Sequence, residues 1–111
     1  MNFAYRLNPG VPRGIVGWWP VVGDTASDVA GPHNGVMSAV AIVPGMVDSA
    51  FGFDGVSSLM SVSDAPTLDF TGDYTLEFWV NPDAVQKPFA NMVRKEDPAN
   101  PNGFGIEIHA K

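Results

Sequence analysis

Three aspartates in loop-like stretches are the first residues whose types and spacing could do chemistry. Asp24 and Asp28 lie in one run of turn formers, residues 23–34, which we expect to be a loop, and Asp54 precedes a glycine in another run. Calcium takes about six to eight oxygen ligands from carboxylates and carbonyls of flexible loops, so these aspartates and the carbonyls of 31–34 predict a calcium site. The alternative is that each aspartate is a turn former that bonds its own backbone. His33 lies nearby, and we interpret it as a loop histidine because imidazole is a poor calcium ligand.

Tryptophan side chains are the second candidates, because a flat aromatic ring can stack on the apolar face of a sugar. Trp79 falls on the polar side of an extended run, beside Glu77, and is the best candidate for such a platform. Trp18 and Trp19 are adjacent, so in a strand they point to opposite faces. At most one of these two can therefore be buried in the same sheet layer. The alternative for Trp79 is packing in the core or against a second sheet, where this residue usually lies.

Two asparagines are candidates for the rim of a ligand site. Asn100 and Asn102 belong to residues 96–103, which form the most loop-like segment of the chain. Loops held by a rigid scaffold often carry binding residues, and amide side chains both donate and accept hydrogen bonds. The alternative is that this segment is only a solvated turn.

The charge and composition exclude several classes of function. The chain of 111 residues has a net charge of −6, and nucleic acids and anionic membrane surfaces both require a basic face. It has no cysteine, which excludes disulfides and thiolate metal sites. No apolar run approaches the roughly 20 residues of a membrane helix, and residues 1–6 have no apolar core of signal-peptide length.

The candidate residues depend on strands to position them, and the clearest strand covers residues 73–82. Tyr74, Leu76, Phe78 and Val80 alternate there with polar residues and Trp79, as the period of two in a strand requires. This pattern predicts a strand with one dry face. Such a strand needs a second layer of structure to cover that face.

Other short apolar or alternating runs, separated by turn formers, predict more strands. They are residues 15–22, 34–38, 40–43, 50–53, 58–63, 91–95 and 104–109. Pro44-Gly45 predicts a type II turn, and Asp54-Gly55 predicts a hairpin that joins residues 50–53 to 58–63. Together these features predict an all-β fold with two stacked antiparallel sheets. We expect residues 1–13 to be a tail or linker and residues 14–111 to form the domain.

The order and spacing of four stretches resemble a known family. The laminin-G-like family of concanavalin A-like lectin/glucanase jelly rolls shows a similar pattern over roughly residues 14–108. The stretches are Gly14–Pro20, Asp28–Gly35, Pro44–Gly55 and Met60–Pro82. The resemblance implies a two-sheet jelly roll of a secreted or cell-surface protein that binds glycans or proteins, often with calcium.

The chain departs from this family at its end. Family members usually continue with several more strands beyond the position of His109, so we expect an incomplete jelly roll, the first part of a domain. A sandwich that lacks strands leaves unpaired edges and exposed apolar faces. We expect a homodimer or a neighbouring domain to complete the sheets.

A catalytic role is not expected. Glycoside hydrolases use two carboxylates, and the related glucanases carry them on one strand as Glu-x-Asp-x-x-Glu. Glu107 fits the first position, but His109 stands where the aspartate belongs, and Glu77 has no second carboxylate on its face. A nucleophile arrangement is also unsupported, because the chain has no cysteine, two histidines and no Gly-x-Ser-x-Gly motif.

Three hypotheses of function therefore stand. The first is a non-catalytic, lectin-like module that binds carbohydrate as part of a secreted or cell-surface protein. The second is a protein-interaction or adhesion module of the same fold, whose sheet edge or apolar face pairs with another chain. The third is a degenerate glycoside hydrolase fragment, which the missing carboxylate pair disfavours.

Overall fold

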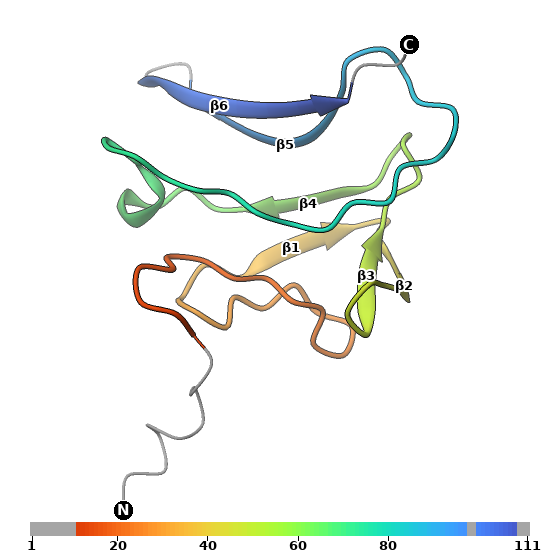
Figure 1. Ribbon diagram of the computed structural model, residues 1–111, viewed down its shortest axis with the longest axis horizontal. Coiled ribbons are helices and arrows are strands. Elements are labelled where there is room, and N and C mark those ends of the chain that lie inside the picture. The colour runs from red at the N-terminus through yellow and green to blue at the C-terminus, as the bar shows by residue number, and fades with distance from the viewer. Residues whose placement is uncertain (1–10, 98–99, 109–111) are drawn as a thin grey trace, which may run out of the picture. The chain divides into compact units, whose positions relative to one another are not determined.

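The computed structural model describes residues 11–97 and 100–108 of the chain. These residues form six strands and one turn of 3-10 helix, which confirms an all-β fold (Figure 1). The chain divides into two compact units, the first ending at Leu68 and the second beginning at Asp69. No helix in the described ranges is long and apolar enough to cross a membrane.

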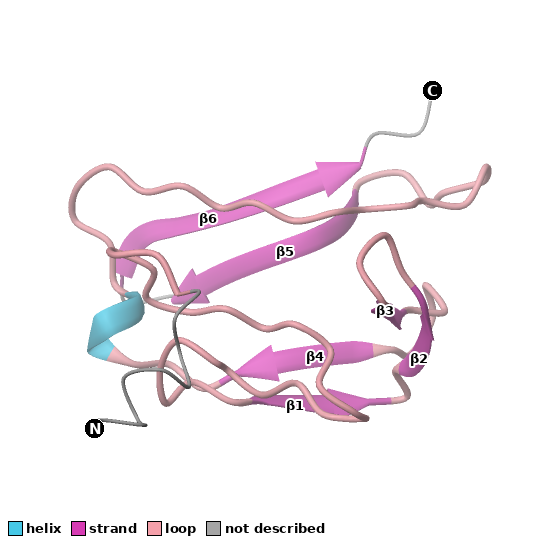
Figure 2. Ribbon diagram, turned by 60° about the horizontal axis from the view of Figure 1, so that its bottom comes forward, coloured by secondary structure: helices cyan, strands magenta, loops and turns pink. Residues whose placement is uncertain are grey.

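The first unit contains four short strands in two separate antiparallel pairs (Figure 2). The strands are β1 (Gly35–Ser38), β2 (Ala41–Pro44), β3 (Ser49–Gly52) and β4 (Leu59–Val62), and the 3-10 turn η1 (Pro66–Leu68) follows them. β1 pairs with β4, and β2 pairs with β3. The strands of this unit therefore form two-stranded sheets rather than one wide layer.

The predicted hairpin between residues 50–53 and 58–63 is wrong. β3 pairs with β2, and β4 pairs with β1, so the two runs belong to different sheets. The physical reason lies in the side chain of Asp54, whose Oδ1 accepts the backbone N–H groups of residues 56–58. These bonds fold 54–58 into a capped loop, and the chain leaves β3 without turning back on it.

The turn between β2 and β3 also differs from the prediction. A type II turn at Pro44-Gly45 needs a left-handed glycine, but the left-handed residue of this turn is Asp48, with φ of 60°. The Gly45 N–H donates to the carbonyl of Asp48 at 3.0 Å. Gly45 is required for a different reason, because a Cβ there would lie 2.8 Å from the backbone of Ser49.

The predicted strand at residues 15–22 is wrong as well. The described chain has only an isolated bridge there, between Val22 and Thr25. Trp18 is held instead by the loop that follows, because its carbonyl accepts the Val29 N–H at 2.9 Å. The loop prediction for residues 23–34 is confirmed, since none of these described residues belongs to a strand.

The second unit contains one hairpin of longer strands. β5 (Ala90–Asp97) pairs antiparallel with β6 (Asn100–Ile108), with register shifts after Asn91 and Lys95. The predicted loop at residues 96–103 is therefore wrong at both ends, because strand residues occupy 96–97 and 100–103. The alternation of 104–108 indicated the strand correctly but underestimated its length.

Residues 73–82, the clearest strand of the sequence, belong to no ladder of the described chain. The backbone runs without a turn or bend through this segment (Figure 1). The chain is extended here as predicted, but the segment is not hydrogen-bonded to a neighbouring strand of the described chain. Just before it, Phe70 stacks on Tyr74 with ring centroids 5.0 Å apart. Lys95 of β5 forms an ion pair with Asp69 at 2.7 Å.

Burial is concentrated in polar residues rather than in an apolar core. Among the described side chains, Ala26 is the one buried apolar residue, and Asp28 and His33 are the buried polar ones. Many large apolar side chains are exposed, including those of residues 74–80. The described part of the chain therefore has its tightest packing around a carboxylate and an imidazole.

Candidate functional site

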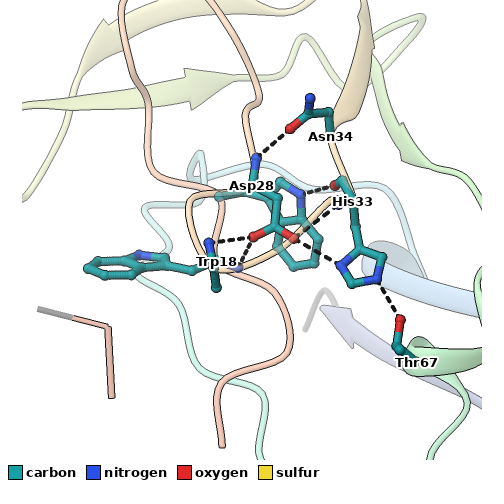
Figure 3. A network of polar contacts seen from close by, with 7 residues as sticks. Trp18, Asp28, His33, Asn34 and Thr67 are labelled. Atoms are coloured by element: carbon teal, nitrogen blue, oxygen red, sulfur yellow. Dashed lines mark hydrogen bonds and ion pairs between the residues drawn. The ribbon is translucent and has the colours of Figure 1, made fainter. Parts of the chain in front are cut away.

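The loop before β1 holds a group of connected polar side chains that we call the Asp28 cluster. It consists of Trp18, Asp28, His33, Asn34 and Thr67 (Figure 3). Asp28 and His33 are each only 8% exposed, and Thr67 comes from η1 near the end of the first unit. The cluster thus joins three stretches of sequence, namely the segment before the loop, the loop itself and η1.

The carboxylate of Asp28 is fully engaged. Its Oδ1 accepts the backbone N–H groups of Trp18 and Ala30, both at 2.9 Å. Its Oδ2 accepts the backbone N–H of His33 at 3.2 Å and contacts the ring Nδ1 of His33 at 2.9 Å. A buried carboxylate is tolerated when its oxygens are hydrogen-bonded in this way.

The imidazole of His33 has a partner on each ring nitrogen. Because a carboxylate accepts, Nδ1 carries the hydrogen that points to Asp28. In the neutral ring Nε2 is then an acceptor, and the hydroxyl of Thr67 donates to it at 2.6 Å. The backbone carbonyl of His33 accepts the indole N–H of Trp19, also at 2.6 Å.

Local sequence explains how the loop closes around Asp28. The Asp28 N–H donates to the side-chain oxygen of Asn34 at 3.0 Å, which ties the two ends of the loop together. Gly31 leaves room at the centre, because a Cβ there would lie 3.2 Å from Oδ2 of Asp28 and 3.3 Å from the His33 ring. Gly17 is constrained more tightly, since a Cβ there would overlap the ring of Trp19.

Two opposing effects act on the pKa of Asp28. Burial of the carboxylate acts to raise the pKa, while the hydrogen bonds from Trp18, Ala30 and His33 act to lower it. The hydrogen bonds together prevail, and the pKa lies below its ordinary value. Asp28 is therefore charged in the folded chain at neutral pH.

The order of contacts in the cluster matches that of a nucleophile, a base and an orienting carboxylate. Thr67 is exposed, whereas the side chains of His33 and Asp28 are 6% and 0% exposed. Asp28 also accepts hydrogen bonds from three backbone N–H groups. Together with the contact between His33 and Thr67, these bonds hold the loop to η1.

Sequence reasoning identified part of this cluster and assigned it another role. Asp28 was a candidate calcium ligand, and His33 was interpreted as a loop histidine. Thr67 was not identified, because it lies 34 residues from His33 and no motif links them. The available signal was local, an aspartate five residues before a histidine in a loop rich in turn formers.

The three predicted calcium ligands are not brought together as one group. No three His, Cys, Asp or Glu side chains of the described residues gather as a metal site. Asp28 has both oxygens in hydrogen bonds, and Asp24 is exposed on the surface. Calcium binding by these aspartates stays a prediction.

Asp54 follows the turn-former alternative. Its Oδ1 accepts three backbone N–H groups, and its Oδ2 accepts the hydroxyl of Ser57 at 2.8 Å. These hydrogen bonds hold the pKa of Asp54 well below its usual range. Ser58 extends the loop contacts, because its hydroxyl donates to the carbonyl of Ala39.

The predicted carbohydrate residues lie in the second unit. Trp79 is 76% exposed, the highest value of any aromatic side chain in the described ranges, and Glu77 is exposed too. The two are separated by one residue in an extended segment, so their side chains lie on the same side. Asn100 and Asn102 lie in β6, and their side chains are outside the described part of the chain.

The other two tryptophans differ from each other. Trp18 has a largely exposed side chain, and its backbone N–H donates to Asp28. Trp19 is half-buried and is fixed by its bond to the carbonyl of His33. Of the pair, Trp18 is thus the more exposed, and the core packing that was the alternative for Trp79 is not seen in the described chain, where it is 76% exposed.

Comparisons with known proteins add no relative to this description. No family model, no curated protein and no solved structure matches the chain.

Proposed function

We propose that this chain is a non-catalytic carbohydrate-binding module of a secreted or cell-surface protein. The observation that carries the proposal is the exposure of Trp79, whose ring is open to solvent on an extended segment. A large aromatic surface in water is unfavourable unless a ligand covers it, and a sugar ring offers a flat apolar face of matching size.

Glu77 complements this platform. Its exposed carboxylate lies on the same side of the segment as Trp79 and can accept hydrogen bonds from sugar hydroxyl groups. An aromatic ring for stacking and a carboxylate for hydroxyl groups are a minimal set for binding a neutral sugar. The same carboxylate repels anionic polysaccharides, so neutral glycans are the expected class.

The test is a binding assay with purified chain and a panel of neutral and anionic polysaccharides. We expect saturable binding to at least one neutral polysaccharide, measured by calorimetry and by the change in tryptophan fluorescence. Trp79→Ala should weaken this binding by at least about fivefold, because the stacking surface is lost. Each titration is run with calcium and with a chelator, which tests the calcium prediction in the same experiment.

Trp18→Ala is the matched control. It removes another exposed indole but keeps the backbone N–H that binds Asp28. Equal loss of binding in both variants would contradict a specific role of Trp79. Absence of binding to every polysaccharide would overturn the proposed function.

A further inference from the structure

Residues 73–83 form an extended run with two chemically different sides, which we call the acidic-apolar segment. Side chains alternate along an extended backbone, so Leu76, Phe78 and Val80 share one side. Asp73, Glu77 and Asp83 lie on the opposite side, together with Trp79; the acidic side and the apolar side are thus separated by the pleat.

The apolar side is only partly covered. Leu76, Phe78 and Val80 are 38%, 43% and 53% exposed, although their sequence pattern is that of a strand with one dry face. The segment takes part in none of the three described ladders, which pair β1 with β4, β2 with β3 and β5 with β6. An extended run of this kind is a template for pairing with a further strand.

The charge distribution restricts what this strand can be. Between residues 14 and 86 the sequence has nine Asp or Glu and no Lys or Arg. Asp73, Glu77 and Asp83 are all exposed within the segment. A strand added beside it would place its own side chains next to these carboxylates on one face and next to the apolar residues on the other.

We propose that the acidic-apolar segment pairs with a strand of another protein in which apolar and basic residues alternate. The apolar residues of that strand cover Leu76 and Phe78, and its basic residues lie beside Asp73 and Glu77. Backbone hydrogen bonds between the two strands supply affinity, and the alternating side chains supply specificity. A second copy of the same segment does not fit, because like charges directly opposite each other destabilise a strand pair.

Two designed peptides test the proposal with the intact chain. Each has about eight residues, the length of an ordinary strand, and alternates valine with lysine or valine with glutamate. Fluorescence anisotropy of labelled peptides should show that the lysine peptide binds at least about tenfold more tightly. Added salt should weaken this binding, because the ion pairs are near the surface.

Variants of the chain locate the interaction. Leu76→Ser combined with Phe78→Ser should weaken binding of the lysine peptide by at least about tenfold, since both apolar contacts are lost. Thr75→Ser, on the opposite side of the segment, is the control and should bind as the original chain does. Glu77→Lys should shift the preference toward the glutamate peptide, and it tests the charge argument without changing the apolar side.

The outcomes that overturn the proposal are distinct from those that overturn carbohydrate binding. Equal binding of the two peptides, no binding of either, or full binding by the double variant would each contradict it. A stable dimer in light scattering that the lysine peptide does not dissociate would assign the segment to a second copy instead. Trp79→Ala removes the sugar platform, and the lysine peptide should still bind this variant at least about tenfold more tightly than the glutamate peptide.

Discussion

The Asp28 cluster and the acidic-apolar segment reverse the usual distribution of polar and apolar residues. In the cluster, a carboxylate and an imidazole are buried at 8% exposure. In the segment, Leu76, Phe78 and Val80 are all exposed, with Phe78 at 43%. The residues that composition alone would place inside lie outside, and those that it would place outside lie inside.

The difference shows that satisfied hydrogen bonds, rather than hydrophobicity, fix the best-packed region of the described chain. The carboxylate of Asp28 has four hydrogen bonds from Trp18 and from the loop in place of bonds to water, so its burial is tolerated. The apolar side chains of the segment can be covered only by another layer, because they have no directional partner to recruit. The hydrogen bonds of one region are complete within the chain, and the other region is the interface that we propose.

Asp28→Ala should have the largest effect on stability of the changes considered. The change leaves the amides of Trp18, Ala30 and His33 without an acceptor inside the fold. We expect a loss of about 3 kcal/mol or more in the free energy of unfolding, measured by urea denaturation. Asp24→Ala is the control, and at this exposed position we expect a change within about 0.5 kcal/mol. Equal effects of the two changes would show that the cluster does not hold the fold.

Folding stability should fall as acid protonates Asp28. The folded-state pKa of Asp28 lies below its ordinary value of 3.8, so its charge stabilises the folded chain fully above that value. This contribution is lost as the pH falls below 3.8 toward the lowered pKa. Urea denaturation between about pH 2 and pH 6 should therefore show stability falling with acid, and less steeply in Asp28→Asn. Parallel curves for the two chains would contradict the assignment.

Thr67→Val should have an intermediate effect. It removes the hydroxyl that donates to Nε2 of His33 and leaves a buried ring nitrogen without that partner. We expect a loss of about 1 kcal/mol in the free energy of unfolding. Thr75→Val makes the same chemical change in the exposed segment and should cost nothing measurable. A neutral Thr67→Val would show that η1 is not clamped by His33.

Phe78→Ser, in the acidic-apolar segment, should have the smallest effect on the free energy of unfolding. Truncation of an ordinary core phenylalanine costs about 3 kcal/mol or more, but Phe78 is 43% exposed in the described chain. We expect a loss below about 0.5 kcal/mol together with reduced binding of a hydrophobic dye. A loss as large as that of a core residue would mean that Phe78 is covered in the isolated chain.

Much of the local structure could be predicted from the sequence. Alternation and turn formers indicated β1, β2, β4 and β5, and the loop at residues 23–34 was expected. The partners of the strands could not be predicted, because Asp54-Gly55 is a strong hairpin signal whose carboxylate caps a loop instead. Short strands pair by contacts along the whole face, and a local signal does not encode these.

The candidate site divides in the same way. The exposure of Trp79 and the shared side of Trp79 and Glu77 follow from a period of two along an extended chain, which the sequence contains. The role of Asp28 could not be predicted from the sequence, because a loop aspartate that binds a cation and one that accepts backbone hydrogen bonds have the same sequence pattern. Only the surrounding amides distinguish the two roles.

Strand periodicity and side-chain type are local properties. The all-β class, the acidic charge and the acidic and apolar sides of residues 73–83 could therefore be inferred from the sequence alone. The tertiary structure decided which strands pair and that Asp28, His33 and Thr67 meet. These contacts join residues up to 34 positions apart. Their formation depends on where folding brings backbone donors and acceptors together, which no local pattern specifies.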